Sequence, residues 1–424
     1  MARRLTVTDG YALINAVAAE MLGKNATIQA VDASTFASVG ESVLQAGTEN
    51  VMNTLSLVCS RDLVAIRPYK AKFRLINALD SGMFSNRVRK LSYYAKDATP
   101  TGASNTQLFT NLAMGKDNGT NPSGGSATAT ESMWLQSTPV TYQAWFGGGI
   151  EWQYPYTLYE NALKAAFRSP EEWTAFLNGF LVSVANDLET EKEAFSRTLV
   201  LNAIAGTYDL TASMPGSVVN LTYEFNQKYG TSYTTAQLLS TYFSEFLGFF
   251  VSMVKTVSDM MENRSVKYHW SPAKTVGGVS YVLPRQTKKE DQRMLMVASF
   301  WNDAESLVMP AIFNDQYLKL DNFEKVDYWQ NINKPFEIDV TPAIPDTSNP
   351  AAQTTGTRVQ LSRVLGCIFD RDAIMVDFHL DSVESSPLEA RKHYRTIWNT
   401  IQKNPIWDAT ENMVIFTMED PVGP

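Results

Sequence analysis

Two aspartates one residue apart form the chain's clearest pairing of groups that could do chemistry. Asp370 and Asp372 flank Arg371 in the sequence. Two further acids, Asp377 and Glu384, follow them. Paired carboxylates act as acid and base in glycoside hydrolysis, or hold metal ions in phosphoester hydrolysis. The flanking segments are apolar runs that supply no helix N-terminus, no second base and no oxyanion donors. The pattern therefore favours a polar turn between two strands over a catalytic pair.

The other reactive side chains show no spacing typical of a site. The three histidines, His269, His379 and His393, are scattered without a metal-binding pattern. The two cysteines, Cys59 and Cys367, lie far apart and indicate reduced, buried thiols. We therefore expect no catalytic residue, no bound metal and no cofactor.

The composition indicates a large protein with an acidic balance. The chain has 424 residues, of which 44% are hydrophobic, and a formal net charge of -8. Such a length can bury a sizeable core. Because its lysines and arginines form no dense run, tight electrostatic binding to nucleic acid is not expected. The sequence shows neither a secretion signal nor an apolar stretch of membrane-spanning length, which predicts a cytoplasmic product.

The longest predicted element is a helix from Arg168 to Gly206. Ser169, Pro170 and Glu172 suit its first turn, and apolar residues recur along it at helical spacing. At 1.5 Å per residue the helix would be about 54 Å long. We expect it to end where Gly206 can adopt a left-handed C′ conformation.

The middle of this helix carries an acidic belt. Its members are Asp187, Glu189, Glu191 and Glu193, with only Lys192 opposing them. Like charges at helical spacing repel one another. The belt is therefore either solvated or matched by a basic partner.

A long hairpin is predicted before the helix, from Phe84 to Glu151. Its outgoing strand is basic and its return half is aromatic, the residues being Arg87, Arg89 and Lys90, and Trp134, Trp145 and Phe146. The intervening tract is rich in Gly, Asn, Ser and Thr and buries too little to order itself. Gly147, Gly148 and Gly149 close the base, where they suit a hinge or bulge better than a phosphate loop. Because a two-stranded hairpin is marginal alone in water, this one must lie on another surface, in this chain or a neighbour.

The remaining segments predict an arm, a second domain and a return. Residues 1 to about 65 contain two weakly amphipathic helical pieces, over 10–23 and 41–62, that suit an extended arm. A helix starting at Thr234, with Gln237 completing a capping box, is apolar around most of its circumference and suits a core. Strands and helices follow it, then a proline- and threonine-rich linker over 338–357. The last segment reads as strands around a short helix within 387–405.

The order of these elements resembles the major capsid proteins of tailed bacteriophages, with their Hong Kong 97-type fold, in a podophage-like form. The resemblance is carried by "STFASVGESVLQAGTENVMNTLSLVCSRDLVAIRPYKAKF" in the arm, by "TKKEDQRMLMVASFWNDAESLVMPAIFNDQYLKL" and by "GCIFDRDAIMV". It implies an α+β fold of five parts. These are an N-terminal arm with the entry to a peripheral domain (1–83), an E-loop hairpin (84–151), the peripheral domain with its spine helix (152–206), an axial domain (207–350), and a return to the peripheral domain with a C-terminal strand (351–424).

The resemblance also implies a function. Copies of the chain would assemble into pentamers and hexamers of an icosahedral phage head around double-stranded DNA, without sequence-specific binding and without a membrane. The expected partners are further copies, a separate scaffolding protein, a portal, and decoration or head-fibre proteins. The protein would reside in the virion after assembly in the host cytoplasm.

Two charged clusters of opposite sign suggest how neighbouring subunits would be aligned. We expect the basic residues Arg87, Arg89 and Lys90 to meet the acids Glu189, Glu191 and Glu193 of a neighbour's helix. Exposed pairs are worth at most about 1 kcal/mol each, so they would set register more than strength. Apolar burial by Trp134, Trp145 and Phe146 would supply the strength. The joints that such a shell requires would be Gly147 to Gly149 and Gly206.

Two other classes of protein remain open at this point. A tail-sheath or surface-layer subunit would share the projecting hairpin, although it would not normally have a capped spine helix so early in the chain. A glycoside-hydrolase-type enzyme would account for nine tryptophans, eighteen tyrosines and the Asp370–Asp372 turn. Aromatic residues are equally common at buried interfaces.

Overall fold

The computed structural model places most of the chain from the hairpin base onwards. It describes residues 14, 15, 18, 30, 35, 36, 39, 73, 75–79, 87–95, 139–147, 150–159, 161–162, 165, 169–272, 274–276, 279–307, 322–346, 353–387, 389 and 391–419. The predicted helical piece at 41–62, and the hairpin residues Trp134, Gly148 and Gly149, lie outside these ranges.

The long predicted helix is present and is longer than expected. Helix α6 runs over Pro170–Asp209, 40 residues, and the Ser169 hydroxyl accepts the Glu172 N–H at its N-terminus. The prediction that it ends at Gly206 is wrong, because the helix continues to Asp209. A Cβ on Gly206 would lie 2.2 Å from the ring of Trp407. The glycine therefore allows a close approach of helix and indole and does not form the helix end.

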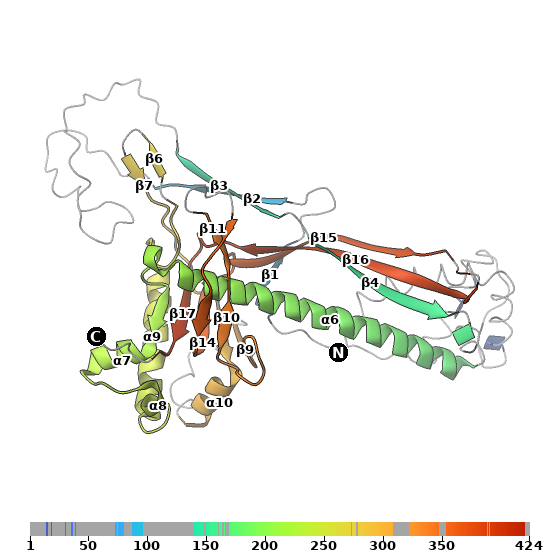
Figure 1. The fold of residues 1–424 in the computed structure, drawn as a ribbon, viewed down its shortest axis with the longest axis horizontal. Helices are drawn as coiled ribbons and strands as arrows, with labels where there is room; N and C mark the ends of the chain where they lie inside the picture. Colours follow the sequence, from blue (N-terminus) through green and yellow to red (C-terminus); the bar gives the residue numbers. More distant parts are fainter. Residues whose placement is uncertain are drawn as a thin grey trace, which may run out of the picture.

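The five-stranded sheet lies between α6 and a second group of helices (Figure 1). Its strand order is β5-β17-β14-β8-β9. The bounds are β5 Val218–Asn220, β8 Gln292–Val297, β9 Phe323–Val326, β14 Val364–Asp370 and β17 Met413–Thr417. The helices are α7 Leu221–Tyr229, α8 Thr235–Leu238, α9 Phe243–Met261 and α10 Ala298–Leu307, with a 3-10 turn, η1, at Thr211–Ser213.

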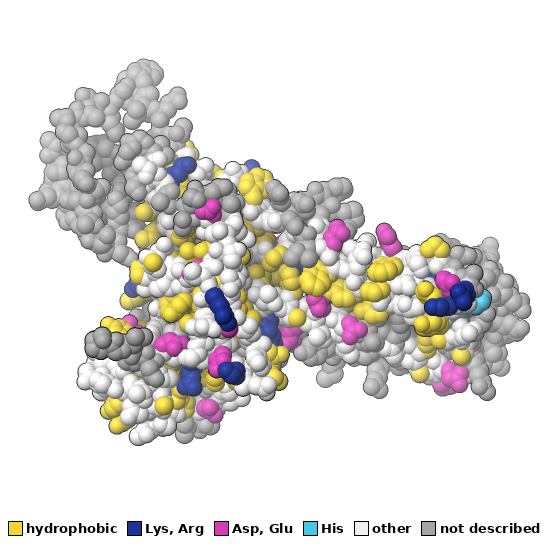
Figure 2. Space-filling model, viewed as in Figure 1, with side chains coloured by type: hydrophobic (Ala, Val, Ile, Leu, Met, Phe, Trp, Pro, Cys, Tyr) yellow, Lys and Arg dark blue, Asp and Glu magenta, His cyan; other side chains and the backbone are white. Residues whose placement is uncertain are grey.

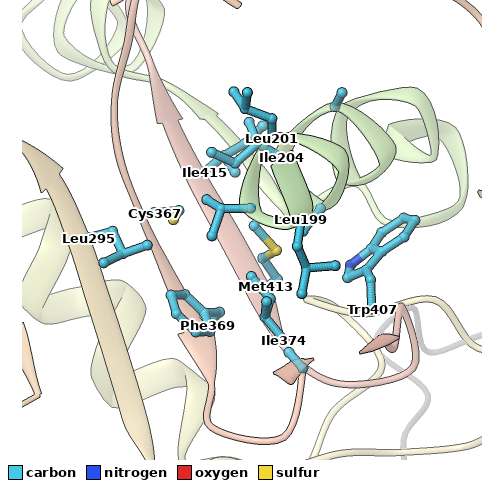
Figure 3. Close-up of a cluster of buried hydrophobic side chains, with 14 of the residues drawn as sticks. Leu199, Leu201, Ile204, Leu295, Cys367, Phe369, Ile374, Trp407, Met413 and Ile415 are labelled. Carbon is cyan, nitrogen blue, oxygen red and sulfur yellow. The ribbon is translucent and has the colours of Figure 1, made fainter. Parts of the chain in front are cut away.

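Alternate side chains of this sheet enter two different cores. Cys367 and Ile415 face α6, in the cluster drawn in Figure 3, whereas Ile368 and Val414 face α9. All seven residues of β14 and all five of β17 are buried. Burial of both faces explains why these strands read as unbroken apolar runs in the sequence.

The four-stranded sheet extends beside α6, away from the body of the molecule (Figure 1). Its order is β1-β15-β16-β4, with bounds β1 Asn77–Leu79, β4 Ile150–Tyr159, β15 Ile374–Ser385 and β16 Tyr394–Trp407. The short helix predicted within 387–405 is wrong, because β16 is a strand of 14 residues there. Threonine and isoleucine recur in that segment, and β-branched residues favour the half-buried surface of a sheet.

The predicted hairpin is present at its base. Strands β2 (Arg87–Tyr93) and β3 (Thr141–Gly147) pair antiparallel, with Arg89 opposite Trp145. Gly147, the last residue of β3, has φ 131, in the region that favours glycine. This position suits the joint that the sequence predicts.

Several smaller expectations need correction. The capping box of Thr234 and Gln237 is confirmed, but the helix predicted after it is two helices, α8 and α9. The expected linker over 338–357 contains strands that form two small antiparallel pairs. Their bounds are β10 Ile338–Val340 paired with β13 Val359–Leu361, and β11 Ala343–Pro345 paired with β12 Gln353–Thr355. A further small hairpin joins β6 Lys274–Val276 to β7 Val279–Tyr281.

Candidate assembly surfaces

The inner face of the hairpin packs on another part of the same chain around Leu283, and we call this contact the seat of the hairpin. Tyr94 and Tyr142 are buried there with Leu283, their rings edge to face at a centroid distance of 6.4 Å. The Ala95 N–H donates to the Val282 carbonyl at 2.9 Å. This seat meets the requirement that an isolated hairpin be covered on one face.

Ion pairs at the same seat fix the basic strand. The Lys90 ammonium lies 2.5 Å from an Asp408 carboxylate oxygen and 2.6 Å from one of Glu411, and Arg285 lies 3.2 Å from Glu411. Burial alone would lower the pKa of Lys90, but the two carboxylates outweigh it and raise the pKa. Lys90, expected to face a neighbour, is thus bonded within its own chain.

The outer face of the hairpin carries exposed apolar side chains. Leu91 is 44% exposed, Tyr93 58% and Trp145 49%. The Arg89 guanidinium lies 5.8 Å from the centroid of the Trp145 ring, on the same face. Phe146, expected to contact a neighbour, is half-buried and packs toward the seat. The side chain of Arg87 lies outside the described residues.

The four-stranded sheet has a second exposed aromatic face. Trp398 is 38% exposed and lies between Pro155 of β4 and the exposed Glu384 of β15. Tyr159 is 55% exposed, with its ring 6.0 Å from that of Tyr394. Figure 2 shows hydrophobic side chains in a band along the extended part of the molecule that contains α6 and this sheet. Single exposed aromatics are ordinary, but several on one face of a sheet indicate an interface.

The opposite face of this sheet contacts α6 and encloses a lysine. Lys403 is 1% exposed, and its ammonium lies 5.5 to 6.0 Å from the ring centroids of Phe195, Trp152 and Tyr154. Burial lowers the pKa of Lys403, and the charge of Glu191 on α6 opposes that shift. Aromatic faces stabilise a buried cation in this arrangement.

The acidic belt of α6 has cations of its own chain beside it. Lys192 lies 3.4 Å from Glu189, and Arg197 lies 2.7 Å from Glu193. The charge of Glu191 acts on Lys403. A neighbour's basic strand is therefore not required to balance the belt.

The Asp370–Asp372 turn has the geometry of a structural turn. Asp370 is buried and accepts a hydrogen bond from Thr287, while the Asp372 N–H donates to its other oxygen. Burial raises the pKa of Asp370. Arg371 pairs with Asp291 at 3.4 Å. The two carboxyls thus have different environments, because Asp370 is buried whereas Asp372 is partly exposed.

The histidines also lie apart. His269 is buried between Asn412 and Leu283, and burial lowers its pKa to about 4. His393 is exposed in a turn with φ 51. The side chain of His379 lies outside the described residues. Among the residues that the structure describes, no group of His, Cys, Asp or Glu could hold a metal ion.

Several functional residues escaped prediction from sequence. Asp408 and Glu411 lie in one turn and Arg285 lies in an isolated β-bridge with Ser265. All three anchor the hairpin, from which they are distant in the chain. Leu91 and Tyr93 could have been found, since they alternate with buried Ser92 and Tyr94 along the strand.

A chain that seats one face of its hairpin and leaves two aromatic surfaces exposed has the character of an assembling structural subunit. A family model described as "Phi29-like phage major capsid protein" matches residues 83–417, and the chain belongs to that family. The predicted α+β class and Hong Kong 97-type order of hairpin, spine helix, mixed sheet and returning strands are confirmed. The protein is thus a major capsid protein whose copies form an icosahedral head.

Solved phage structures show similar chains at low sequence identity. One, from "Capsid structure of Staphylococcus phage Andhra", is 14% identical with a TM-score of 0.49, over 83% of this chain and 85% of that chain. A second, from "Structure of head fiber and inner core protein gp22 of native bacteriophage P68", is 13% identical with a TM-score of 0.47, over 84% and 86%. A third, from "Asymmetric unit of bacteriophage PhiM1 mature capsid", is 8% identical with a TM-score of 0.42, over 84% and 89%. No curated protein sequence matches this chain.

The family identifies a component of the virion. Within the described part of the chain, no helix combines the length and the apolar character needed to cross a bilayer.

Proposed function

We propose that the outer face of the β2–β3 hairpin is covered by a neighbouring subunit in the shell. The observation that carries this proposal is the contrast between the two faces of the same two strands. The inner face is buried on its own chain, whereas Leu91, Tyr93 and Trp145 are about half exposed. Covering these side chains in every copy would contribute apolar burial to the closed shell.

The charge that sets register is Arg89, together with Arg87, since Lys90 is bonded within its own chain. The acidic partner on the neighbour is one of two. The first is the belt of α6, in which Glu191 and Glu193 are half-buried and Glu189 is buried. The second is Glu384, which is exposed beside Trp398 on the aromatic face of the four-stranded sheet.

The joints lie where glycine permits unusual backbone. Gly147 supports this proposal through its φ of 131 at the end of β3. Gly148 and Gly149 extend the same joint. Gly206, predicted as a second joint, is packed on Trp407, so bending there would have to move the indole. Differences in hairpin angle between five- and six-fold rings therefore arise at Gly147–Gly149.

The wider setting follows from the resemblance and the family. The shell assembles in the host cytoplasm, with a separate scaffolding protein and a portal, encloses double-stranded DNA without sequence-specific contacts, and accepts decoration or head-fibre proteins. The chain has no catalytic role. The burial of Asp370 in a hydrogen-bonded turn supports this last point.

A charge-swap experiment tests the hairpin contact and identifies its partner. Arg89→Glu should lower the yield of closed shells, counted by electron microscopy, while the isolated subunit unfolds as the wild type does. Glu191→Arg in the same chain should restore the yield if the belt is the partner, and Glu384→Arg should do so if the sheet face is. Lys288→Glu, on a side chain that is 69% exposed elsewhere, is the matched control. Normal shell yield from Arg89→Glu would contradict the proposal.

A further inference from the structure

A relay of four buried polar side chains runs beneath the hairpin. Nε2 of His269 lies 2.6 Å from the Leu283 carbonyl oxygen, and Nδ1 lies 3.0 Å from Oδ1 of Asn412. Nδ2 of Asn412 donates to the Thr287 hydroxyl at 3.1 Å, which donates to Oδ2 of Asp370 at 2.7 Å. The four side chains belong to residues that are at most 7% exposed. Water therefore cannot replace a bond that the relay fails to make.

The relay ends at the residue on which the hairpin is seated. Leu283 packs against Tyr94 and Tyr142 of the hairpin, and its N–H donates to the Ser271 hydroxyl at 2.9 Å. Because His269 holds the Leu283 carbonyl, the relay helps to position the seat. The adjoining Val282 carbonyl accepts the Ala95 N–H.

The donors and acceptors of the relay match when it carries one extra proton. In a first form, His269 is an imidazolium that donates to Leu283 and Asn412, Asn412 donates to Thr287, and Thr287 donates to an ionised Asp370. In a second form the Asn412 amide is turned over. Protonated Asp370 then donates to Thr287, Thr287 to the amide oxygen, and the amide N–H to Nδ1 of a neutral His269. Every group is satisfied in both forms.

Any other proton count leaves a mismatch. With neutral His269 and ionised Asp370, either Nδ1 faces the amide oxygen of Asn412 or the Thr287 oxygen faces Asp370 without a hydrogen between them. With both groups protonated, the Thr287 hydroxyl hydrogen has no acceptor within the relay. Mismatched buried polar groups are costly, so the geometry favours a single shared proton.

We propose that His269, Asn412, Thr287 and Asp370 form a latch that holds one shared proton and thereby keeps the hairpin firmly seated. Loss of that proton to solvent as pH rises places acceptor against acceptor, at Asn412, at Thr287 or, when the neutral ring carries its hydrogen on Nδ1, at the Leu283 carbonyl. The mismatch loosens the seat. The stability of the contact between the hairpin and the rest of its own subunit would thus depend on pH.

The surrounding charges modulate the latch without replacing it. Arg285 opposes protonation of His269 and Asp408 favours it. Asp372 favours protonation of Asp370, whereas Lys90 opposes it. Burial lowers the pKa of His269 and raises that of Asp370, and both directions favour the one-proton form in which Asp370 carries the proton.

Spectroscopy of assembled shells tests the proton count. The chain has three histidines, so ring ¹⁵N resonances can be assigned with His269→Gln. At pH 7 we expect a neutral His269 together with an infrared band of a protonated carboxyl that disappears in Asp370→Asn. An imidazolium with an ionised carboxyl is the other one-proton form and also supports the latch. A neutral ring beside an ionised Asp370 overturns it.

Hydrogen exchange of residues 87–95 tests the coupling to the hairpin. Asp370→Asn places an amide N–H where the protonated acid places its O–H, so its relay is satisfied without a titratable proton. As pH rises, wild-type protection, corrected for intrinsic exchange, should fall on the order of tenfold. Protection in Asp370→Asn should stay constant. The control Asp372→Asn should keep the fall of the wild type but show it at lower pH, because Asp372 no longer favours protonation of Asp370. Thr287→Val, which cuts the relay, should lower protection at every pH. Identical pH profiles for the wild type and Asp370→Asn would overturn the coupling.

Discussion

The five-stranded and the four-stranded sheet share helix α6, but among the elements that the structure describes, only the five-stranded sheet has helices packed on both of its faces. Its strands β14 and β17 are wholly buried, between α6 on one side and α9 and α10 on the other. The four-stranded sheet packs α6 on one face and exposes Trp398 and Tyr159 on the other. It also buries polar side chains, among them Lys403 and Asn404.

Side chains buried between the sheets and helices stabilise the fold of the subunit, whereas side chains exposed on the outer face of the four-stranded sheet are available for assembly. Strand β16 carries one tryptophan of each kind. Trp407, at one end, is 4% exposed in the core against Gly206, whereas Trp398 is 38% exposed on the outer face. The same residue type, on one strand, therefore serves folding at one position and is available for a neighbour at the other.

The largest expected effect is on the buried indole. Trp407→Ala should destabilise the isolated subunit by about 3–5 kcal/mol, the range for removing a large buried aromatic side chain. Trp398→Ala, the matched control on β16, should cost less than about 1 kcal/mol. Denaturant unfolding of unassembled subunits measures both. Equal destabilisation by the two changes would remove the distinction between the two sheets.

A smaller loss is expected at the hairpin seat. Lys90→Met leaves Asp408 and Glu411 buried without their lysine, which should cost about 3 kcal/mol, the low end for breaking a buried ion pair. The loss should be local and appear as faster hydrogen exchange of residues 87–95. Lys288→Met, an exposed lysine, is the control. Unchanged exchange in Lys90→Met would show that the ion pairs do not hold the hairpin.

The same ion pairs predict a pH window for the seat. Burial would raise the pKa of Asp408, but Lys90 and Thr410 outweigh it and lower the pKa. The stabilisation that Asp408 provides is therefore present above its ordinary value of 3.8 and lost as pH falls through the lowered pKa. The pKa of Lys90 is raised, so its contribution is present below 10.5 and lost as pH rises through the raised value.

Glu411 behaves differently from its neighbour. Burial raises its pKa in spite of Lys90 and Arg285, so Glu411 takes up a proton before Asp408 as pH falls. Because the folded pKa of Glu411 is raised, its protonation does not weaken the fold as pH falls. On the acid side, exchange of residues 87–95 should therefore accelerate only in strong acid, where Asp408 takes up a proton, and Asp408→Asn should remove that acid step. An acid step that persists in Asp408→Asn would assign it to another group.

The smallest effect on the free subunit is expected from the outer face of the hairpin. Tyr93→Ser and Trp145→Ser should each change the stability of the isolated chain by less than about 1 kcal/mol, because both side chains are about half exposed. They should nevertheless lower the yield of closed shells. Sedimentation separates subunits from shells in such preparations. Full shell yield from the double variant would contradict a contact at this face.

The sequence predicted the elements whose signals are local. Ser169, Pro170 and Glu172 located the start of α6, and Thr234 with Gln237 located α8, because caps depend on neighbours within one turn. The end of α6 was misplaced because Gly206 serves a contact with Trp407, two hundred residues away in the chain. A glycine required by tertiary packing looks the same in sequence as one required by a helix end.

The candidate surfaces were predicted only in part. Arg89 and Trp145 lie on the exposed face as an alternating strand predicts, but Lys90 lies on the seat with Asp408 and Glu411. Strand alternation shows that Arg89 and Lys90 point to opposite faces, but it does not show which face the chain covers. That choice depends on the 408–411 turn, which no local pattern connects to the hairpin.

A cryo-electron microscopy reconstruction of shells assembled from this chain would show whether neighbouring subunits cover the outer face of the hairpin. We expect a closed icosahedral shell in which the face that carries Arg89, Leu91, Tyr93 and Trp145 is buried against a neighbouring copy. We also expect the Lys90–Asp408 pair within each subunit to be retained. A shell in which that face remains open to solvent would contradict the proposed contact.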